Sequence, residues 1–374
     1  MKALRFILIA SLFLPLMFAT AQVGKIVIPA GTDEDKALTA INAETDQTQK
    51  IAKYEQFLKD FSSNPAAVAY GNWQLAQEWQ TAGDLEKALA YVDKAVAASP
   101  NNLEILVSAV NIAQAAKDNL KAVDYAVAGG SAFHSIATQP KPEGTPDGDL
   151  SARVSEEERV NRPNYEFMEA AAYNAIAAVN DAKTRMSLIE RYTPAFPASK
   201  FEEQISQLAM VSLQELNDPP RVIAYGEKSL RSNPESVPTL LLLANAYVED
   251  PKQLAKAIEY AGKAAKLAKG EEPDAADQAK LSTGMAKSTL GYALLKQSKA
   301  ALAVPELKKA TELLASNEQV QQEALYRLAY AYALLAPPKR AEAREALNRC
   351  IAIGGPYKPL AEDLLKKVTA PAKK

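Results

Sequence analysis

The chain has almost none of the side chains on which catalysis and metal binding usually depend. Its 374 residues include one histidine, His134, and one cysteine, Cys350. Without a second nitrogen or sulfur donor, a zinc site is not expected, and no serine lies in a G-x-S-x-G turn that could join His134 in a triad. Neither Gly129-Gly130 nor Gly354-Gly355 has the Lys-Ser/Thr of a phosphate-binding loop. We therefore expect no catalytic residues, no metal and no cofactor.

The chain also lacks an excess of charge of either sign. Lysine and arginine number 43 against 45 aspartates and glutamates, which gives a net charge of −2 at pH 7. Such a balance, without a long run of like charge, provides no general field for nucleic acid. Nucleic acid is therefore not expected among its partners. Hydrophobic residues make up 48% of the chain, a share that argues against general disorder.

Long apolar runs are missing as well, apart from one short run at the amino terminus. Lys2 and Arg5 precede the apolar run Phe6–Phe18, and Ala19-Thr20-Ala21 has the small-x-small pattern of a cleavage site. We expect residues 1–21 to be a cleaved signal peptide, which predicts a periplasmic or secreted protein with no stable membrane span. No cysteine follows the site, so a lipid anchor is not expected. The alternative is an uncleaved anchor, for which the run is short.

What the chain does contain is paired helical patterns, most clearly from Ala69 to Pro100. The first half places large and small residues on one helical face, Gly83-Asp84 interrupts the pattern, and the second half forms another such face. Small residues let two antiparallel helices approach closely, while large residues fill the space between them. The residues on the two faces are Leu75, Ala76, Trp79, Ala88, Val92 and Ala95.

This stretch resembles a tetratricopeptide repeat. Counted from Ala69, it has Leu at position 7, Ala at 8, Trp at 11, Gly at 15, Ala at 20 and 27, and Pro at 32, in register with a period of about 34 residues. Asn72 departs from the family, which often has Trp there. Further units follow along most of the chain, the other strong match being Gly284–Ala315. The resemblance implies an all-α fold, a right-handed helical solenoid of antiparallel helix hairpins.

The same patterns predict how the chain is divided. Residues 138–150 are rich in Pro, Gly and charge and have no hydrophobic period, which indicates an exposed loop. Pro163 is expected to open the next helix, and Gly129-Gly130 stands where a helix end is expected. The expected parts are a signal peptide (1–21), an N-terminal extension (22–44), N-terminal repeats (45–137), a loop or linker (138–162), C-terminal repeats (163–354), and a capping helix with a tail (355–374).

The resemblance also implies a function. In this family the first helix of each hairpin lines a concave groove that takes peptides or folded proteins, usually through positions 2, 5, 9, 12 and 13 of the repeat. It thus implies a non-catalytic protein–protein interaction scaffold or adaptor in the bacterial cell envelope, with a protein or peptide partner. The Lys–Asn pair that holds a terminal carboxylate in some members is not present here, because these two positions are Trp73 and Gln77 in one unit and Leu241 and Asn245 in another. The implied partner-binding residues are Tyr70, Trp73, Gln77, Asn245, Tyr292, Tyr326 and Tyr330.

Two alternatives stay open from the sequence. The aromatic residues of the groove could instead stack on sugar rings, which would make the protein a cell-wall, glycan or solute-binding module. Any one of the tyrosines could also simply pack between neighbouring repeats. The partner's identity and the oligomeric state are not encoded in the pattern, because stacking residues specify the fold rather than the ligand.

Overall fold

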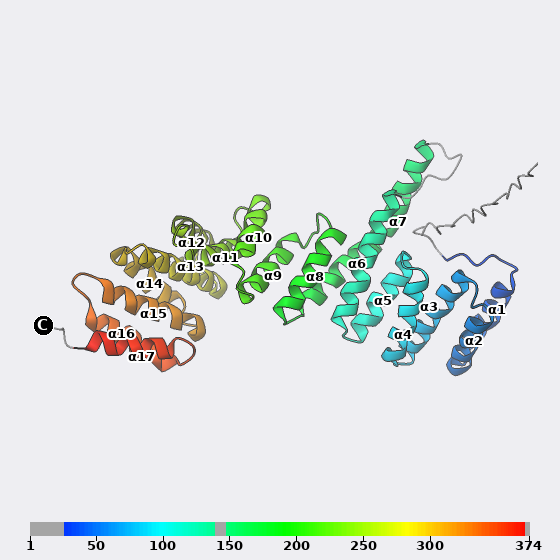
Figure 1. Ribbon diagram of the computed structural model, residues 1–374, viewed down its shortest axis with the longest axis horizontal. Helices are drawn as coiled ribbons and strands as arrows, with labels where there is room; N and C mark the ends of the chain where they lie inside the picture. The colour runs from blue at the N-terminus through cyan, green and yellow to red at the C-terminus, as the bar shows by residue number, and fades with distance from the viewer. Residues whose placement is uncertain (1–25, 139–146, 371–374) are drawn as a thin grey trace, which may run out of the picture. The chain divides into compact units, whose positions relative to one another are not determined.

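The computed structural model of the chain describes residues 26–138 and 147–370 (Figure 1). Within these ranges the regular elements are helices, and no strand occurs. They form two compact units, one ending at Ala172 and the other beginning at Tyr173. The predicted signal peptide, the first part of the predicted loop and the end of the tail lie outside the described residues.

Unit 1 is a series of helices in which α1 to α6 each pack against the next in the chain, and α3 also contacts α5. The final helix, α7, begins in unit 1, and its last residues belong to unit 2. The elements are α1 (Asp33–Asn42), α2 (Gln47–Asp60), α3 (Pro65–Thr81), α4 (Leu85–Ala98), α5 (Leu103–Ala115), α6 (Asn119–Ser135), the 3-10 helix η1 (Ile136–Thr138) and α7 (Asp147–Ala177).

Unit 2 repeats this arrangement over a longer stretch. From α8 to α17 each helix packs against the next, and α9, α11, α13, α15 and α17 also contact one another in series. We call these five helices the first-helix layer of unit 2, because each opens a hairpin or caps the last one. The helices are α8 (Ala182–Ala195), α9 (Glu202–Glu215), α10 (Pro219–Ser232), α11 (Val237–Val248), α12 (Leu254–Ala268), α13 (Asp277–Lys296), α14 (Ala300–Leu313), α15 (Glu318–Leu334), α16 (Arg340–Ile353) and α17 (Lys358–Thr369).

The predicted all-α fold of stacked antiparallel helix hairpins is therefore confirmed. The strong repeat of the sequence is the pair α3 and α4, with a core of Leu75, Ala88 and Val92, all fully buried. Its small residues stand where the two helices cross, as the pattern predicts. The capping helix expected near the carboxyl end is α17, which buries Ala361 and Leu364.

Four of the hairpin turns contain a residue with positive φ. Gly83 fills this position between α3 and α4, with φ +80°. Lys117, Asn217 and Ser298 occupy the equivalent turns, with φ of 58°, 54° and 60°, values that side chains other than glycine seldom adopt. The sequence therefore indicates the turn at Gly83, but it gives no such signal at the equivalent turns, where Lys117, Asn217 and Ser298 stand in place of glycine.

The prediction of a loop over residues 138–162 is wrong from Asp147 onward. Helix α7 begins there and continues through Pro163, which was expected to open it. Pro163 has no N–H to donate to the carbonyl four residues earlier, but it is exposed, so water can bind that carbonyl instead. Most side chains between Ser151 and Val160 are also exposed, which explains why the segment has no apolar period.

Gly129 lies inside α6 rather than at a helix end, and it sets how closely α7 approaches. A Cβ atom at this position would lie 2.1 Å from Met168 Sδ and 2.5 Å from its Cε. Beside it, the rings of Phe133 and Tyr165 lie 4.6 Å apart, and the Arg162 guanidinium lies 4.7 Å from the Phe133 ring. A side chain at position 129 would therefore force the end of the Met168 side chain to move, whereas glycine allows the packing of α6 on α7 as it stands.

In unit 2 a single carboxylate joins three consecutive helices. Glu227 of α10 accepts hydrogen bonds from the hydroxyls of Tyr247 of α11 at 2.7 Å and Tyr260 of α12 at 3.0 Å, and Lys256 Nζ lies 3.7 Å away. Burial alone would raise the pKa of Glu227, but the hydrogen bonds and the lysine outweigh it and lower the pKa below its ordinary value. The charged carboxylate is therefore the form that stabilises the fold.

We expect Gly129→Ala to lower the free energy of unfolding by about 1–3 kcal/mol, because the added methyl collides with Met168. Urea denaturation followed by circular dichroism measures it. Gly262→Ala in α12 is the matched control, since no atom lies within 4 Å of its added Cβ and alanine favours helix. Equal destabilisation by the two variants would contradict the close-approach argument.

We expect Glu227→Gln to lower the free energy of unfolding by about 1–2 kcal/mol near pH 7, since a charged acceptor of two hydrogen bonds is lost. Because the folded-state pKa is lowered, the contribution is complete above the unfolded pKa. It disappears as the pH falls through the folded one, so variant and wild type should converge in acid. Glu259→Gln, at an exposed position of α12, is the control, and a constant difference at all pH values would contradict the role of the charge.

Candidate functional site

Three of the predicted tyrosines lie close together in unit 2. Tyr292 is on α13, while Tyr326 and Tyr330 are on α15, which packs against α13 in the first-helix layer. Burial raises the pKa of Tyr326, and the nearby hydroxyls of Tyr330 and Tyr292 raise it further while Lys367 of α17 opposes them. Tyr330 is 42% exposed, so part of this group faces solvent.

Two cations accompany these rings. Arg327 Cζ lies 4.4 Å from the centroid of the Tyr292 ring, and Lys296 Nζ lies 4.9 Å from the same centroid. Both distances are those of cation–π contacts. The group formed by Tyr292, Lys296, Tyr326, Arg327 and Tyr330 is called the tyrosine–cation surface below.

Hydrogen bonds and ion pairs hold the tyrosine–cation surface in place. Arg327 donates to Ser288 Oγ of α13 at 3.0 Å and pairs with Glu323 at 2.5 Å. The Tyr357 hydroxyl, just before α17, donates to the same Glu323 at 2.6 Å, and its ring lies 5.7 Å from that of Tyr326. Side chains from three successive elements are thus fixed before any partner arrives, which reduces the entropy lost on binding.

Lys296 extends this network to α11. Its ammonium donates to the Val248 carbonyl at 3.0 Å and to Glu249 at 2.8 Å. Burial would lower the pKa of Lys296, but Glu249 and the Tyr292 hydroxyl raise it overall, so the lysine stays charged at neutral pH. Of the predicted residues, Asn245 of α11 also reaches α13, because its Oδ1 accepts from the Thr289 hydroxyl at 2.7 Å.

The other three predicted residues lie on α3 in unit 1 and are half-buried. The rings of Tyr70 and Trp73 meet edge to face at 6.2 Å. Trp73 packs on a cluster that includes Ala95 and Ile105, together with Ile26 of the N-terminal extension. Its indole Nε1 is buried, and no partner for it occurs in the part of the chain that the structure describes. Trp73 is therefore chiefly a packing residue, and Gln77 lies one turn further along α3.

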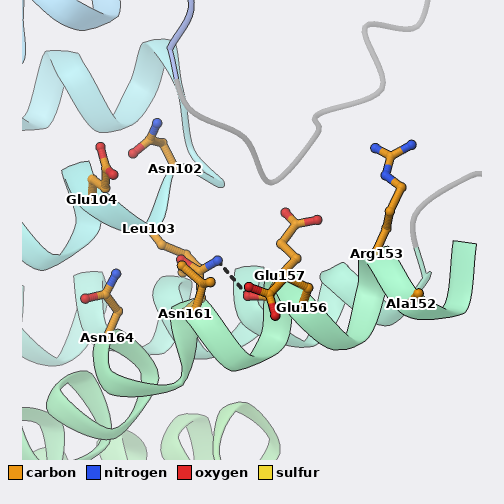
Figure 2. Close-up of a pocket in the computed structure, with 10 residues that line it drawn as sticks. Asn102, Leu103, Glu104, Ala152, Arg153, Glu156, Glu157, Asn161 and Asn164 are labelled. Carbon is orange, nitrogen blue, oxygen red and sulfur yellow. Dashed lines mark hydrogen bonds between the residues drawn. The ribbon is translucent and has the colours of Figure 1, made fainter. Parts of the chain in front are cut away.

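A cavity of about 590 Å³ was not foreseen from the sequence (Figure 2). It lies in unit 1 between residues 102–104, at the start of α5, and seven residues of α7 between Ala152 and Asn164. The sequence reading missed it because this part of α7 was expected to be a loop. The available signal was the helix-compatible run after Ser151, which contains neither glycine nor proline until Pro163.

The described residues also include the candidates for metal binding and for a reactive side chain. Within residues 26–138 and 147–370, no group of three or more His, Cys, Asp or Glu side chains could hold a metal ion. Cys350 is buried, and burial raises its pKa to about 11, so it is a neutral packing residue as predicted. His134 is exposed in the last turn of α6, against the Tyr165 ring.

Comparison with known proteins identifies likenesses of fold. No protein-family model matches the chain, and no curated protein matches it in sequence. Similar solved structures are a tetratricopeptide repeat protein from Parabacteroides merdae (12% identity, 85% of this chain and 99% of that one, TM-score 0.37) and the TPR domain of P58(IPK) (12%, 90% and 97%, TM-score 0.30). The C-terminal part of a TPR repeat-containing protein from Cytophaga hutchinsonii is another (17%, 79% and 99%, TM-score 0.41).

Among the described helices there is no candidate for a membrane-spanning segment. None of them combines the length and the apolar character that a span requires.

If Trp73 is a packing residue, Trp73→Phe should lower the free energy of unfolding by only about 1 kcal/mol, because a smaller aromatic ring still fills most of the space and the N–H that is lost has no partner. Trp73→Ala should cost about 3 kcal/mol, because it removes the ring that packs against Ala69, Ala95 and Ile105. Thermal and urea unfolding of both variants measure this difference. A Trp73→Phe variant of unchanged stability that no longer retains a protein partner would instead give the indole a binding role.

Proposed function

We propose that the protein is a non-catalytic protein–protein interaction scaffold of the bacterial cell envelope, and that a partner docks on the tyrosine–cation surface of unit 2. The observation that carries the proposal is the gathering of three tyrosines and two cations on adjacent helices of one layer. Tyrosine and arginine are enriched where protein interfaces concentrate their binding energy. The partly exposed Tyr330 is the first side chain that a partner would meet.

The charges of the surface indicate what such a partner offers. Arg327 and Lys296 are already paired with Glu323 and Glu249, so the surface is not an open positive patch. The surface therefore offers a partner mainly the aromatic rings and hydroxyl groups of its tyrosines, held in a fixed arrangement. A protein segment with apolar side chains and backbone hydrogen-bonding groups matches it better than a highly charged ligand.

The glycan-binding alternative receives less support. A sugar stacks on the face of an aromatic ring, but the Tyr292 ring already has two cations in contact. Binding a sugar there would require displacing Arg327 or Lys296 from its contacts. The proposal therefore remains a protein partner.

The envelope location in this proposal rests on the signal-peptide pattern of residues 1–21. Its test is the sequence of the amino terminus of the protein purified from cells. A terminus at Gln22 in the exported fraction supports export with cleavage, and an intact Met1 in the cytosolic fraction contradicts it.

We expect the double variant Tyr292→Ala, Tyr330→Ala to lose a partner that the wild type retains from envelope extract, with affinity weakened about tenfold or more, as for residues central to an interface. Quantitative mass spectrometry of material retained by the immobilised protein measures this. Leu302→Ala on α14, where the side chain is 59% exposed, is the matched surface control.

Two results would contradict the proposal. One is retention of the same proteins, in the same amounts, by the wild type and the double variant. The other is an absence of retained protein together with a rise in melting temperature on adding muropeptides, which would favour the glycan-binding alternative.

A further inference from the structure

Unit 2 contains a cavity between the end of α8, the start of α9 and one side of α10. Its volume is about 230 Å³. An apolar cavity of about 150 Å³ is large enough to hold a benzene ring. The cavity of unit 2 therefore has room for one six-membered ring with a small substituent.

The floor of this cavity is apolar except for one hydroxyl group. Its most buried side chains are Tyr192 and Phe196 of α8 together with Ile205 and Ser206 of α9. The rings of Tyr192 and Phe196 lie 4.8 Å apart. Rings and aliphatic groups of this kind favour an apolar occupant over water. The cavity is called the Ser206 pocket below.

Ser206 supplies the hydroxyl group of the floor, and this group has no partner. Its residue is 7% exposed, and no hydrogen bond to its side chain occurs within residues 26–138 and 147–370. The other two serine and threonine hydroxyls of the lining are already bonded. Thr193 donates to the Ile189 carbonyl at 2.9 Å, and Ser199 Oγ lies 2.7 Å from the Tyr192 hydroxyl. A ligand that brought a donor or an acceptor to Ser206 would remove the cost of leaving it unbonded.

The mouth of the Ser206 pocket carries one charge of each sign. Lys228 Nζ of α10 lies 3.3 Å from the carboxylate of Glu202 of α9, and both side chains are exposed. Because the two charges compensate each other, the mouth favours neither an anion nor a cation. A charged group would also lose its hydration on reaching the apolar floor. The matching ligand is therefore a neutral ring with one polar substituent.

Among neutral side chains, tyrosine fits this description. Its hydroxyl group stands at the end of the ring farthest from the backbone, so it reaches the floor while the peptide chain stays outside. Thr193 and Ala198, at the mouth, are exposed, which leaves room for that chain. Phenylalanine would leave Ser206 without a partner, and tryptophan carries its N–H on the side of a larger ring system.

We propose that the Ser206 pocket binds the tyrosine side chain of a partner protein. The phenol hydroxyl hydrogen-bonds to Ser206 Oγ, and the ring contacts Phe196 and Ile205. The connection that borders the mouth is held before binding, since Ser199 Oγ accepts from the Phe201 N–H at 3.0 Å. The pocket shares no residue with the tyrosine–cation surface, so it stands or falls independently of the function proposed above.

The test compares two pentapeptides with capped ends, Gly-Gly-Tyr-Gly-Gly and Gly-Gly-Phe-Gly-Gly, in titrations of the purified chain followed by saturation-transfer NMR. The tyrosine peptide should bind saturably and about threefold to tenfold more tightly than the phenylalanine peptide, because only its hydroxyl gives Ser206 a partner. Equal affinity of the two peptides, or no saturable binding of the tyrosine peptide, would overturn the proposal.

A variant of the floor then locates the binding. Ser206→Ala should abolish the preference for tyrosine and leave the affinity of the phenylalanine peptide within about twofold, a result that a merely structural role of the hydroxyl would not produce. Ser187→Ala makes the same change at an exposed position of α8 outside the pocket and should keep the preference. A preference that persists in Ser206→Ala, or an equal loss of both peptides, would overturn the proposal. Circular dichroism confirms that each variant folds.

Free 4-methylphenol distinguishes a side chain from a small phenol as the occupant. It should compete with the tyrosine peptide for the same site, and Ser206→Ala should weaken both. Binding of 4-methylphenol without binding of the peptide would overturn the assignment to a partner protein, since the mouth would then not admit a peptide chain. Tyr292→Ala with Tyr330→Ala should leave peptide binding unchanged, and a loss in that variant would place the peptide on the tyrosine–cation surface instead.

Discussion

The close approach of neighbouring helices is the constraint on which the rest of the structure depends. Stacked hairpins bury their apolar residues only if successive helices come near enough for side chains to interlock. At Gly291 of α13 an added Cβ would lie 2.4 Å from Leu307 of α14, and at Gly129 of α6 it would collide with Met168 of α7. Small residues at these crossings set the spacing, and large ones such as Leu75 fill the space around them. Each hairpin buries its apolar residues only against its neighbours. The stability of each unit therefore depends on the packing at every contact between successive helices.

This arrangement separates the residues that stabilise the fold from those available for binding. Glu227 joins α10, α11 and α12 through the hydroxyls of Tyr247 and Tyr260, so these two tyrosines serve packing. Tyr292 of α13 lies instead beside two cations whose own ion pairs hold them in place, and Tyr330 of α15 is 42% exposed. The same residue type thus has two roles in one unit. What distinguishes them is exposure, since Tyr247 is 2% exposed and Tyr330 is 42% exposed.

The sequence predicted the helix pairs well because small and large residues recur at fixed spacing, as in α3 and α4. It predicted the helix face of Tyr292, Tyr326 and Tyr330, but the repeat register could not reveal Arg327 at the Tyr292 ring. The register also could not reveal that Ile26, outside the repeats, packs against the same buried cluster as Trp73. Helix α7 was missed between Asp147 and Pro163, because an exposed helix has no apolar period and proline normally ends one. An apolar period in the sequence shows which face of a helix is buried. It therefore cannot predict a helix that is exposed on most sides, nor a contact with a segment that is distant in the sequence.

The central claim is that the first-helix layer of unit 2, rather than its other faces, receives a protein partner. The most direct measurement places a photo-crosslinking amino acid at Tyr330 of α15 in living cells of the source organism, and at Leu302 of α14, which is also exposed, in parallel. The account predicts a discrete cross-linked protein from position 330 and none from position 302. The same products from both positions, or none from position 330, would contradict it.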